Sequence, residues 1–228
     1  MDNAVAVCCP AEGMVYMTSP KEMYYDKRAV QLVKNLKSRH FDAYYCANAD
    51  QALETALSLI PEGASVGWGG AMSAQQIGLM TALRQGNYAV IDREQCTTPE
   101  EIERVYMDCL HADYFLTGAN GLSIDGEMVN IDGTGNRLAA ITYGPKNVIV
   151  IAGMNKVMDT LEDAVSRARS VAAPLNIQRF DKNTPCSVTG VCADCKSKEC
   201  ICNQILITRN CRPEGRIKFI LVGQDLGL

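Results

Sequence analysis

The chain has 228 residues, of which 47% are hydrophobic, so it can bury a substantial core without covalent cross-links. Its net charge of -4, without any block of Lys or Arg, gives no electrostatic basis for a nucleic-acid partner. Because the N-terminal sequence MDNAVAVCCPAEG lacks the features of a signal peptide and no stretch approaches the ~18 apolar residues that span a bilayer, we expect a soluble, cytoplasmic protein with no membrane partner.

In chain order, the first predicted element is a long helix. Ser19 is followed by Pro20 and then by Glu22, which is the pattern of an N-cap with a capping box. A short strand rich in aromatic residues is predicted at 43–47, and a second helix opens at Asn48. The sequence therefore begins with a helix, strand, helix order.

The next elements repeat this order. A strand at 64–68 leads through a glycine-rich turn into a helix that we predict Ser73 to cap and that runs to about Leu83. A strand at 87–92 then precedes another helix, which begins at Thr98 with the same cap signature as the first.

In the following segment, the spacing of the apolar residues changes from a helical to an alternating pattern. Residues 122–131 alternate around the dipeptide Asp125-Gly126, which predicts a β-hairpin. A β-branched run at 147–153 is typical of a strand buried on both faces, and Asp159 is predicted to cap the helix after it. The sequence RIKFILVG near the C-terminus predicts a last strand.

Strands that alternate with helices imply an α/β fold with a mainly parallel sheet and helices on both faces. To this we add a β-hairpin insertion and a cysteine-rich C-terminal segment. No internal repeat, linker or low-complexity tract divides the chain. We therefore predict a single domain over residues 1–228, with the cysteine-rich segment 184–211 inside it.

The glycine-rich turn is a candidate anion site. Gly67, Gly69 and Gly70 lie between a strand and a helix, where backbone N–H groups without neighbouring Cβ atoms could face a phosphate or carboxylate. A tight turn with no ligand is an equal alternative, because the pattern is neither a P-loop nor a full dinucleotide fingerprint.

A polar cluster follows around the predicted hairpin. Asp132 is a candidate catalytic acid or base, and Arg137 is a candidate catalytic residue that could clamp a carboxylate or phosphate. Turn formation is the commoner role of such Asn, Asp and Gly residues, but side chains at strand ends lie where parallel sheets bind ligands. The candidate ligand-binding residues are Gly67, Gly69, Gly70, Ser73, Asn120, Asn130, Asn136, Asn155 and Lys156.

Three stretches, VGWGGAMSAQQIGL, FLTGANGLSIDGEMVNIDGTGNRLAAITYGPKNVIVIAGMNKV and AAPLNIQRF, together resemble the LUD (lactate utilisation) domain family from about Met23 to the C-terminus. The resemblance implies the NagB/RpiA/CoA transferase-like fold, whose members bind anionic sugar phosphates or CoA esters at the glycine turn and hairpin. It also implies a place in the bacterial three-part system that oxidises L-lactate to pyruvate, with iron–sulfur oxidoreductase subunits as partners. The chain looks like the short stand-alone branch.

Two positions depart from the pattern that the resemblance implies. The family usually has Gly-Gly-Ser where this chain has Gly69, Gly70 and Ala71. Sugar-phosphate isomerases of the superfamily tend to carry Asn-Lys where this chain has Asn130 and Ile131. Isomerase chemistry is therefore not carried over.

Eleven cysteines make an odd total, and those outside the C-terminal segment are scattered, which indicates a reducing compartment. Five of them follow the spacing C-x5-C-x2-C-x4-C-x-C, which predicts a four-thiolate metal site. Zinc is the simplest occupant, and an iron–sulfur cluster is the competitor although the ferredoxin spacing is lacking. Reversible disulfides and unligated thiols are the alternatives. The candidate metal ligands are Cys186, Cys192, Cys195, Cys200 and Cys202.

Three functions follow from these features. The first is a LUD-type protein that binds a small anionic metabolite and serves lactate oxidation. The second is a stand-alone sugar-phosphate isomerase or acyl-CoA transferase-like enzyme with Asp132 as its acid or base. The third is a metal-sensing or redox-sensing regulatory protein. The sequence leaves the substrate open, and a homo-oligomer stays among the alternatives for its assembly.

Overall fold

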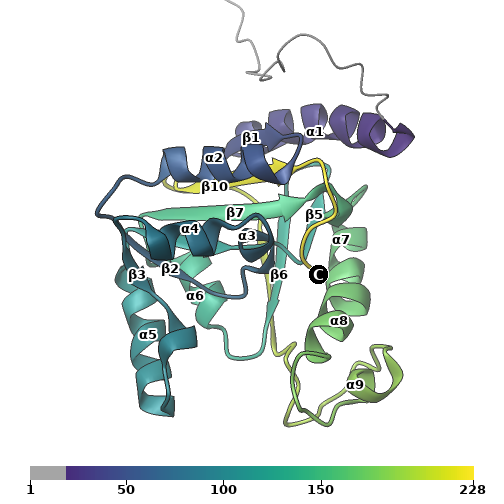
Figure 1. The fold of residues 1–228 in the computed structure, drawn as a ribbon. Coiled ribbons are helices and arrows are strands. Elements are labelled where there is room, and N and C mark those ends of the chain that lie inside the picture. Colours follow the sequence, from purple (N-terminus) through teal and green to yellow (C-terminus); the bar gives the residue numbers. More distant parts are fainter. Residues whose placement is uncertain (1–18) are drawn as a thin grey trace, which may run out of the picture.

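The computed structural model describes residues 19–228. The N-terminal segment from which we expected no signal peptide lies outside the described residues. A six-stranded sheet forms the centre, with strand order β1-β10-β7-β4-β2-β3, and every neighbouring pair is parallel (Figure 1). Its strands are β1 (Asp42–Cys46), β2 (Ser65–Trp68), β3 (Ala89–Ile91), β4 (Tyr114–Thr117), β7 (Asn147–Gly153) and β10 (Ile217–Val222).

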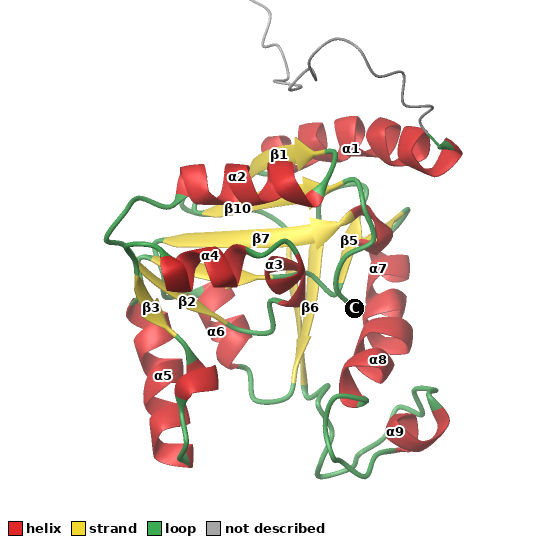
Figure 2. Ribbon diagram, viewed as in Figure 1, coloured by secondary structure: helices red, strands yellow, loops and turns green. Residues whose placement is uncertain are grey.

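Helices cover both faces of this sheet, which confirms the predicted α/β class (Figure 2). The reason is visible in β7, where Val148 and Val150 pack on one face and Ile149 and Ile151 on the other, all of them fully buried. The first face is covered by α1 (Pro20–Ser38), α5 (Pro99–His111) and α6 (Asn136–Thr142), and the second by α2 (Ala49–Leu59), α3 (Met72–Gln76) and α4 (Leu79–Gln85).

The predicted helix starts at Ser19, Asn48 and Thr98 are confirmed. Each of these side chains accepts a hydrogen bond from the backbone N–H three residues later, and two of them form complete capping boxes. These starts could be predicted because a cap depends on residues within one turn of the helix.

Two predicted caps are wrong. Ser73 lies inside α3 rather than before it, since the N-cap is Ala71, and Gly78 at φ 80° separates α3 from α4. The helix that we expected Asp159 to cap has Thr160 as its N-cap instead.

A second sheet stands beside the first, with strand order β8-β5-β6-β9. It contains the predicted hairpin, in which β5 and β6 pair antiparallel and Gly126 turns with φ 89°. We did not predict β9, which lies inside the cysteine-rich segment 184–211 and pairs antiparallel with β6. The strands of this sheet are β5 (Gly121–Ser123), β6 (Met128–Asp132), β8 (Val157–Met158) and β9 (Gln204–Thr208).

A continuous helical stretch packs against this second sheet. Its residues Ala164 and Ala168 are fully buried against Val129 and Ile131 of β6. The stretch comprises α7 (Leu161–Arg167), the π-helical turn η3 (Ala168–Ala172) and α8 (Ala173–Ile177), and the remaining short helices are η1 (Arg93–Gln95), η2 (Met154–Lys156) and α9 (Pro185–Thr189). Within residues 19–228, no helix is long and apolar enough to cross a bilayer. The extent of the domain stays a prediction.

Candidate functional site

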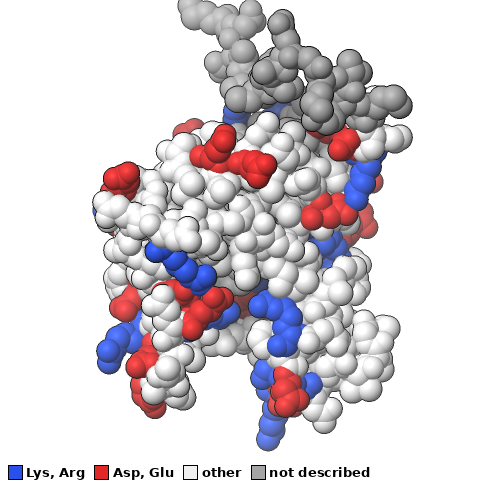
Figure 3. Space-filling model, viewed as in Figure 1, with Lys and Arg blue, Asp and Glu red and all other residues white. Residues whose placement is uncertain are grey.

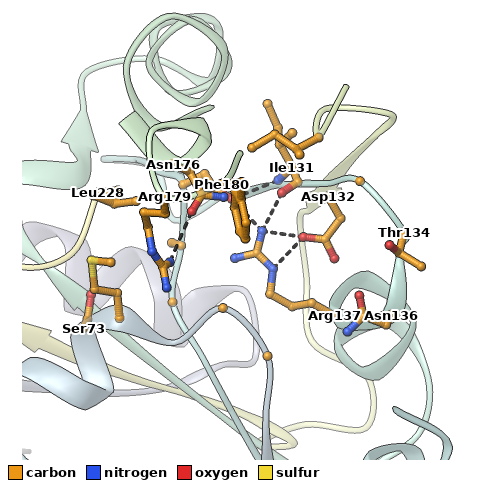
Figure 4. Close-up of a pocket in the computed structure, with 18 of the residues that line it drawn as sticks. Ser73, Ile131, Asp132, Thr134, Asn136, Arg137, Asn176, Arg179, Phe180 and Leu228 are labelled. Atoms are coloured by element: carbon orange, nitrogen blue, oxygen red, sulfur yellow. Dashed lines mark hydrogen bonds and ion pairs between the residues drawn. The ribbon is translucent and has the colours of Figure 1, made fainter. Parts of the chain in front are cut away.

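A cavity of about 270 Å³ opens where strands β2, β4 and β7 end (Figure 4). Parallel strands direct their carboxyl ends to one edge of a sheet, so the loops that follow them meet there. The cavity is lined by Gly69, Gly70, Met72, Ser73, Arg93, Tyr106, Gly118, Ala119, Asn120, Ile131, Asp132, Gly133, Thr134, Asn136, Arg137, Lys156, Asn176, Arg179, Phe180, Lys182, Ile201 and Leu228.

The structure brings most of the predicted site residues to this cavity. Those that line it are Gly69, Gly70, Ser73, Asn120, Asp132, Asn136, Arg137 and Lys156. The other predicted ligand-binding residues have different contacts. Gly67 lies in β2 against Cys109, Asn130 donates from Nδ2 to the Gly118 carbonyl at 2.8 Å, and Asn155 Oδ1 accepts from the Leu226 N–H at 3.1 Å.

Arg137 is the best-fixed side chain of the cavity. It is only 7% exposed, and its Nε donates to Asp132 Oδ1 at 2.8 Å. Its Nη2 donates to Asn120 Oδ1 at 2.9 Å and to the Ile131 carbonyl at 2.6 Å. No described residue accepts a hydrogen bond from Nη1, which lies near Gly70. A buried guanidinium held on one side therefore keeps one nitrogen for a ligand.

The glycine turn makes room for this arginine. A Cβ on Gly69 would lie 3.0 Å from Phe115 Cζ and 3.4 Å from Arg137 Cβ. Gly70 adopts φ 58°, a conformation that L side chains rarely take. The helix that we expected to run from this turn to about Leu83 is divided, and α3 has only five residues. The glycines let Arg137 approach the turn, and anion binding by their N–H groups stays a prediction.

Asp132 serves as the counter-ion of Arg137. One of its oxygens accepts from the guanidinium, and the other, Oδ2, accepts from the Leu138 N–H at 3.2 Å. This arrangement orients the arginine. The assignment of Asp132 as a catalytic acid or base stays a prediction.

Lys156 lines the same cavity and follows the end of β7. Its side chain is buried, and Nζ donates to Ser73 Oγ at 3.2 Å. Burial first, and then the positive charges of Arg167 and Arg137, lower the pKa of Lys156 to about 7. The ammonium and the neutral amine are therefore both populated near neutral pH. Lys156 is therefore not a solvent-exposed lysine.

The rim of the cavity adds positive charge that we did not predict. Arg179 and Phe180 follow α8, and the Arg179 guanidinium lies 5.8 Å from the centre of the Phe180 ring. In Figure 4 the Arg137 and Arg179 side chains extend toward the same space, and Figure 3 shows positive side chains on the α8 side of the hollow. The stretch AAPLNIQRF contained the signal, since it carries these residues directly after a helix.

A second cavity, of about 310 Å³, is lined by all five predicted metal ligands. These cysteines are Cys186, Cys192, Cys195, Cys200 and Cys202. Burial, followed by the nearby thiols of Cys200, Cys186 and Cys192, raises the pKa of Cys202 to about 12. Within residues 19–228, no group of three His, Cys, Asp or Glu side chains is already arranged to hold a metal ion. The metal assignment stays a prediction.

Comparisons with known proteins identify a family and one structure of the same fold. A model of the LUD domain family matches residues 29–222. A crystal structure of a DUF162 family protein from Deinococcus radiodurans is similar with a TM-score of 0.50 and 11% identity, over 87% of this chain and 97% of that chain. Ribose 5-phosphate isomerase from Plasmodium falciparum matches with a TM-score of 0.30 and 12% identity, over 47% and 51% of the two chains. No curated protein matches the sequence. The first of these structures shows a shared fold.

Proposed function

The chain belongs to the LUD domain family, and on that premise we propose that it serves lactate utilisation by binding a small carboxylate metabolite in the cavity around Arg137. The observation that carries this proposal is the state of the guanidinium. Asp132, Asn120 and the Ile131 carbonyl hold two of its nitrogens, while Nη1 faces the cavity. Such a group offers a carboxylate a charge-assisted hydrogen bond without having to be reoriented.

The balance of charge supports an anionic ligand. Among the described residues that line the cavity, Asp132 is the one with an acidic side chain, and it is already paired with Arg137. The cationic side chains around the same space are Arg93, Arg137, Lys156, Arg179 and Lys182. Because the cavity is partly shielded from water, these charges act on a bound anion more strongly than they would at an open surface.

The size of the cavity supports a small ligand. Its volume of about 270 Å³ is below the ~300–1,000 Å³ that is common for pockets of drug-sized molecules. A three-carbon hydroxy acid or oxo acid fits this space, whereas a whole CoA ester would extend well beyond it. The Lys156 ammonium and the Ser73 hydroxyl lie in the same cavity and could bind the oxygen on the second carbon of such an acid.

Calorimetry on the full chain tests the proposal. L-lactate, pyruvate, ribose 5-phosphate and acetyl-CoA would be titrated separately into the wild-type protein. We expect heat of binding with L-lactate or pyruvate. Binding and turnover of ribose 5-phosphate or acetyl-CoA, without binding of either small acid, would replace the proposal with the stand-alone isomerase or transferase alternative. Absence of binding by all four ligands would remove it.

A further inference from the structure

The segment that forms most of the cysteine-lined cavity has little regular structure or apolar burial to stabilise it. Between the end of α9 and the start of β9 the chain forms neither helix nor strand. The nearby apolar side chains Val188 and Val191 are 78% and 66% exposed, so they contribute little burial. Polar contacts such as the Asn183 N–H to Glu199 Oε2, at 2.8 Å, hold the segment only in part.

The turn between Cys192 and Cys195 is shaped so that both face one space. Asp194 adopts φ 49°, which is uncommon for a residue other than glycine. Its carboxylate pairs with Arg169 of the π-helical turn, and Arg169 itself lines the cavity. The turn therefore brings Cys192 and Cys195 to one cavity, beside an Arg169–Asp194 ion pair that also lines it.

The volume of the cavity bears on which metal group could fit in it. At about 310 Å³ it corresponds to the space of on the order of ten waters, at ~30 Å³ each. One zinc ion, with sulfur atoms ~2.3 Å away, fills only a small part of such a space. A cubane iron–sulfur cluster adds four iron and four sulfide atoms between the cysteine sulfurs. Its size therefore matches the cavity better than a single ion does.

We propose that this cavity is the site of a cubane iron–sulfur cluster that is held by four of the five cysteines Cys186, Cys192, Cys195, Cys200 and Cys202. The apolar side chains Ile177, Ile201 and Ile205 also line it. Cluster binding fixes the irregular segment in the way that metal ligation folds other small motifs with little core.

The cluster site shares a wall with the carboxylate cavity. Ile201 lies between two of the cysteines and lines both cavities. Its Cα lies 3.2 Å from the position of a Cβ on Gly133, and Asn203 Nδ2 donates to the Gly133 carbonyl at 3.0 Å. Filling of the cysteine cavity therefore fixes one wall of its neighbour. The cluster site does not depend on the identity of the ligand in that neighbouring cavity.

Composition and spectra of the wild-type full chain, purified without oxygen, test the proposal. We expect iron and acid-labile sulfide at roughly four of each per chain, with broad visible absorption that dithionite bleaches. Protein that arrives without metal would be incubated with iron and sulfide under argon, and it should then gain the same spectrum. Stoichiometric zinc without sulfide would overturn the proposal. So would a chain that gains no cluster and whose five thiols all react with a labelling reagent.

Serine substitutions locate the ligands. Each of the five cysteines would be replaced in turn, and the cluster should be lost in four variants and kept in one. Cys96→Ser is the matched control, because Cys96 is a free, partly buried thiol outside this cavity. Retention of the cluster in all five variants, or its loss in Cys96→Ser, would contradict the assignment. The wild-type measurement stands even if a variant does not fold.

Discussion

Arg137 Nη2 lies 2.7 Å from Asp132 Oδ1, and Nε donates to the same oxygen at 2.8 Å. Both side chains are largely shielded, with 9% and 11% of their surfaces exposed. The pair joins β6 to α6 and places the guanidinium at the end of the central sheet. We therefore expect stability and ligand binding to depend on the same contact.

Removal of one partner of this ion pair should destabilise the folded protein. We expect Asp132→Ala to lower the free energy of unfolding by about 3 kcal/mol, because breaking a buried ion pair leaves its other charge without compensation. Urea denaturation measures this. The control is Asp159→Ala, which breaks a pair with Arg28 at a position where Asp159 is 76% exposed. That variant should lose ~1 kcal/mol or less. Equal losses in the two variants would contradict a structural role for the buried pair.

Lys156 should make stability depend on pH. Its pKa is about 7 in the folded chain and near 10.5 when unfolded, so between these values the unfolded chain binds more protons. The free energy of unfolding should therefore rise with pH across this window, by up to ~1.4 kcal/mol per pH unit from this group. Below pH 7 the lysine is protonated in both states and the cost of its burial is present in full.

The variant Lys156→Met isolates this effect from other titrating groups. We expect wild type to gain stability relative to the variant as pH rises from 7 toward 10.5, in paired urea denaturation series. A difference between the two proteins that stays constant over this range would show that the lysine is not buried as an amine of lowered pKa.

Arg179 should contribute to ligand binding from the rim. We expect Arg179→Ala to weaken binding of L-lactate or pyruvate about tenfold, or ~1.4 kcal/mol, because it removes a charge-assisted contact. Arg104→Ala is the control, since Arg104 is exposed on α5 and does not line the cavity. Calorimetry should find its affinity unchanged. Equal affinities in Arg179→Ala and wild type would place the ligand away from the rim.

The shared wall at Ile201 predicts coupling between the two cavities. Cys195→Ser, which should lack the cluster, is expected to bind L-lactate or pyruvate at least several-fold more weakly than wild type, because the segment that carries Ile201 is then less ordered. Cys96→Ser should bind as wild type does. An unchanged affinity in a cluster-free but folded Cys195→Ser protein would show that the two cavities are not coupled.

The parts of the fold that the sequence predicted are those determined within a few residues. Capping boxes at Ser19 and Thr98 and the turn at Gly126 depend on adjacent side chains and on one backbone conformation, and all three are present. The alternation of strands and helices in turn determined the parallel sheet. The polar residues at its strand ends could be expected to converge for the same reason.

The features that we missed depend on contacts between distant residues. Ser73 was predicted to cap a helix, but its hydroxyl accepts a hydrogen bond from Lys156, 83 residues away. Arg179 reaches the cavity only because the helical stretch before it packs on the second sheet. Strand β9 pairs with a hairpin far earlier in the chain. A local pattern such as AAPLNIQRF can point to a residue, but it does not show which distant residues that residue meets.

The most direct measurement is the affinity of Arg137→Lys for L-lactate and pyruvate, by calorimetry beside the wild type. Lysine keeps the charge but cannot hold Asp132 and Asn120 while also presenting a nitrogen to the cavity. We predict that wild type binds one of the two acids and that the folded variant binds it at least tenfold more weakly. An affinity equal to that of the wild type, in a variant whose unfolding remains cooperative, would contradict carboxylate binding at Arg137.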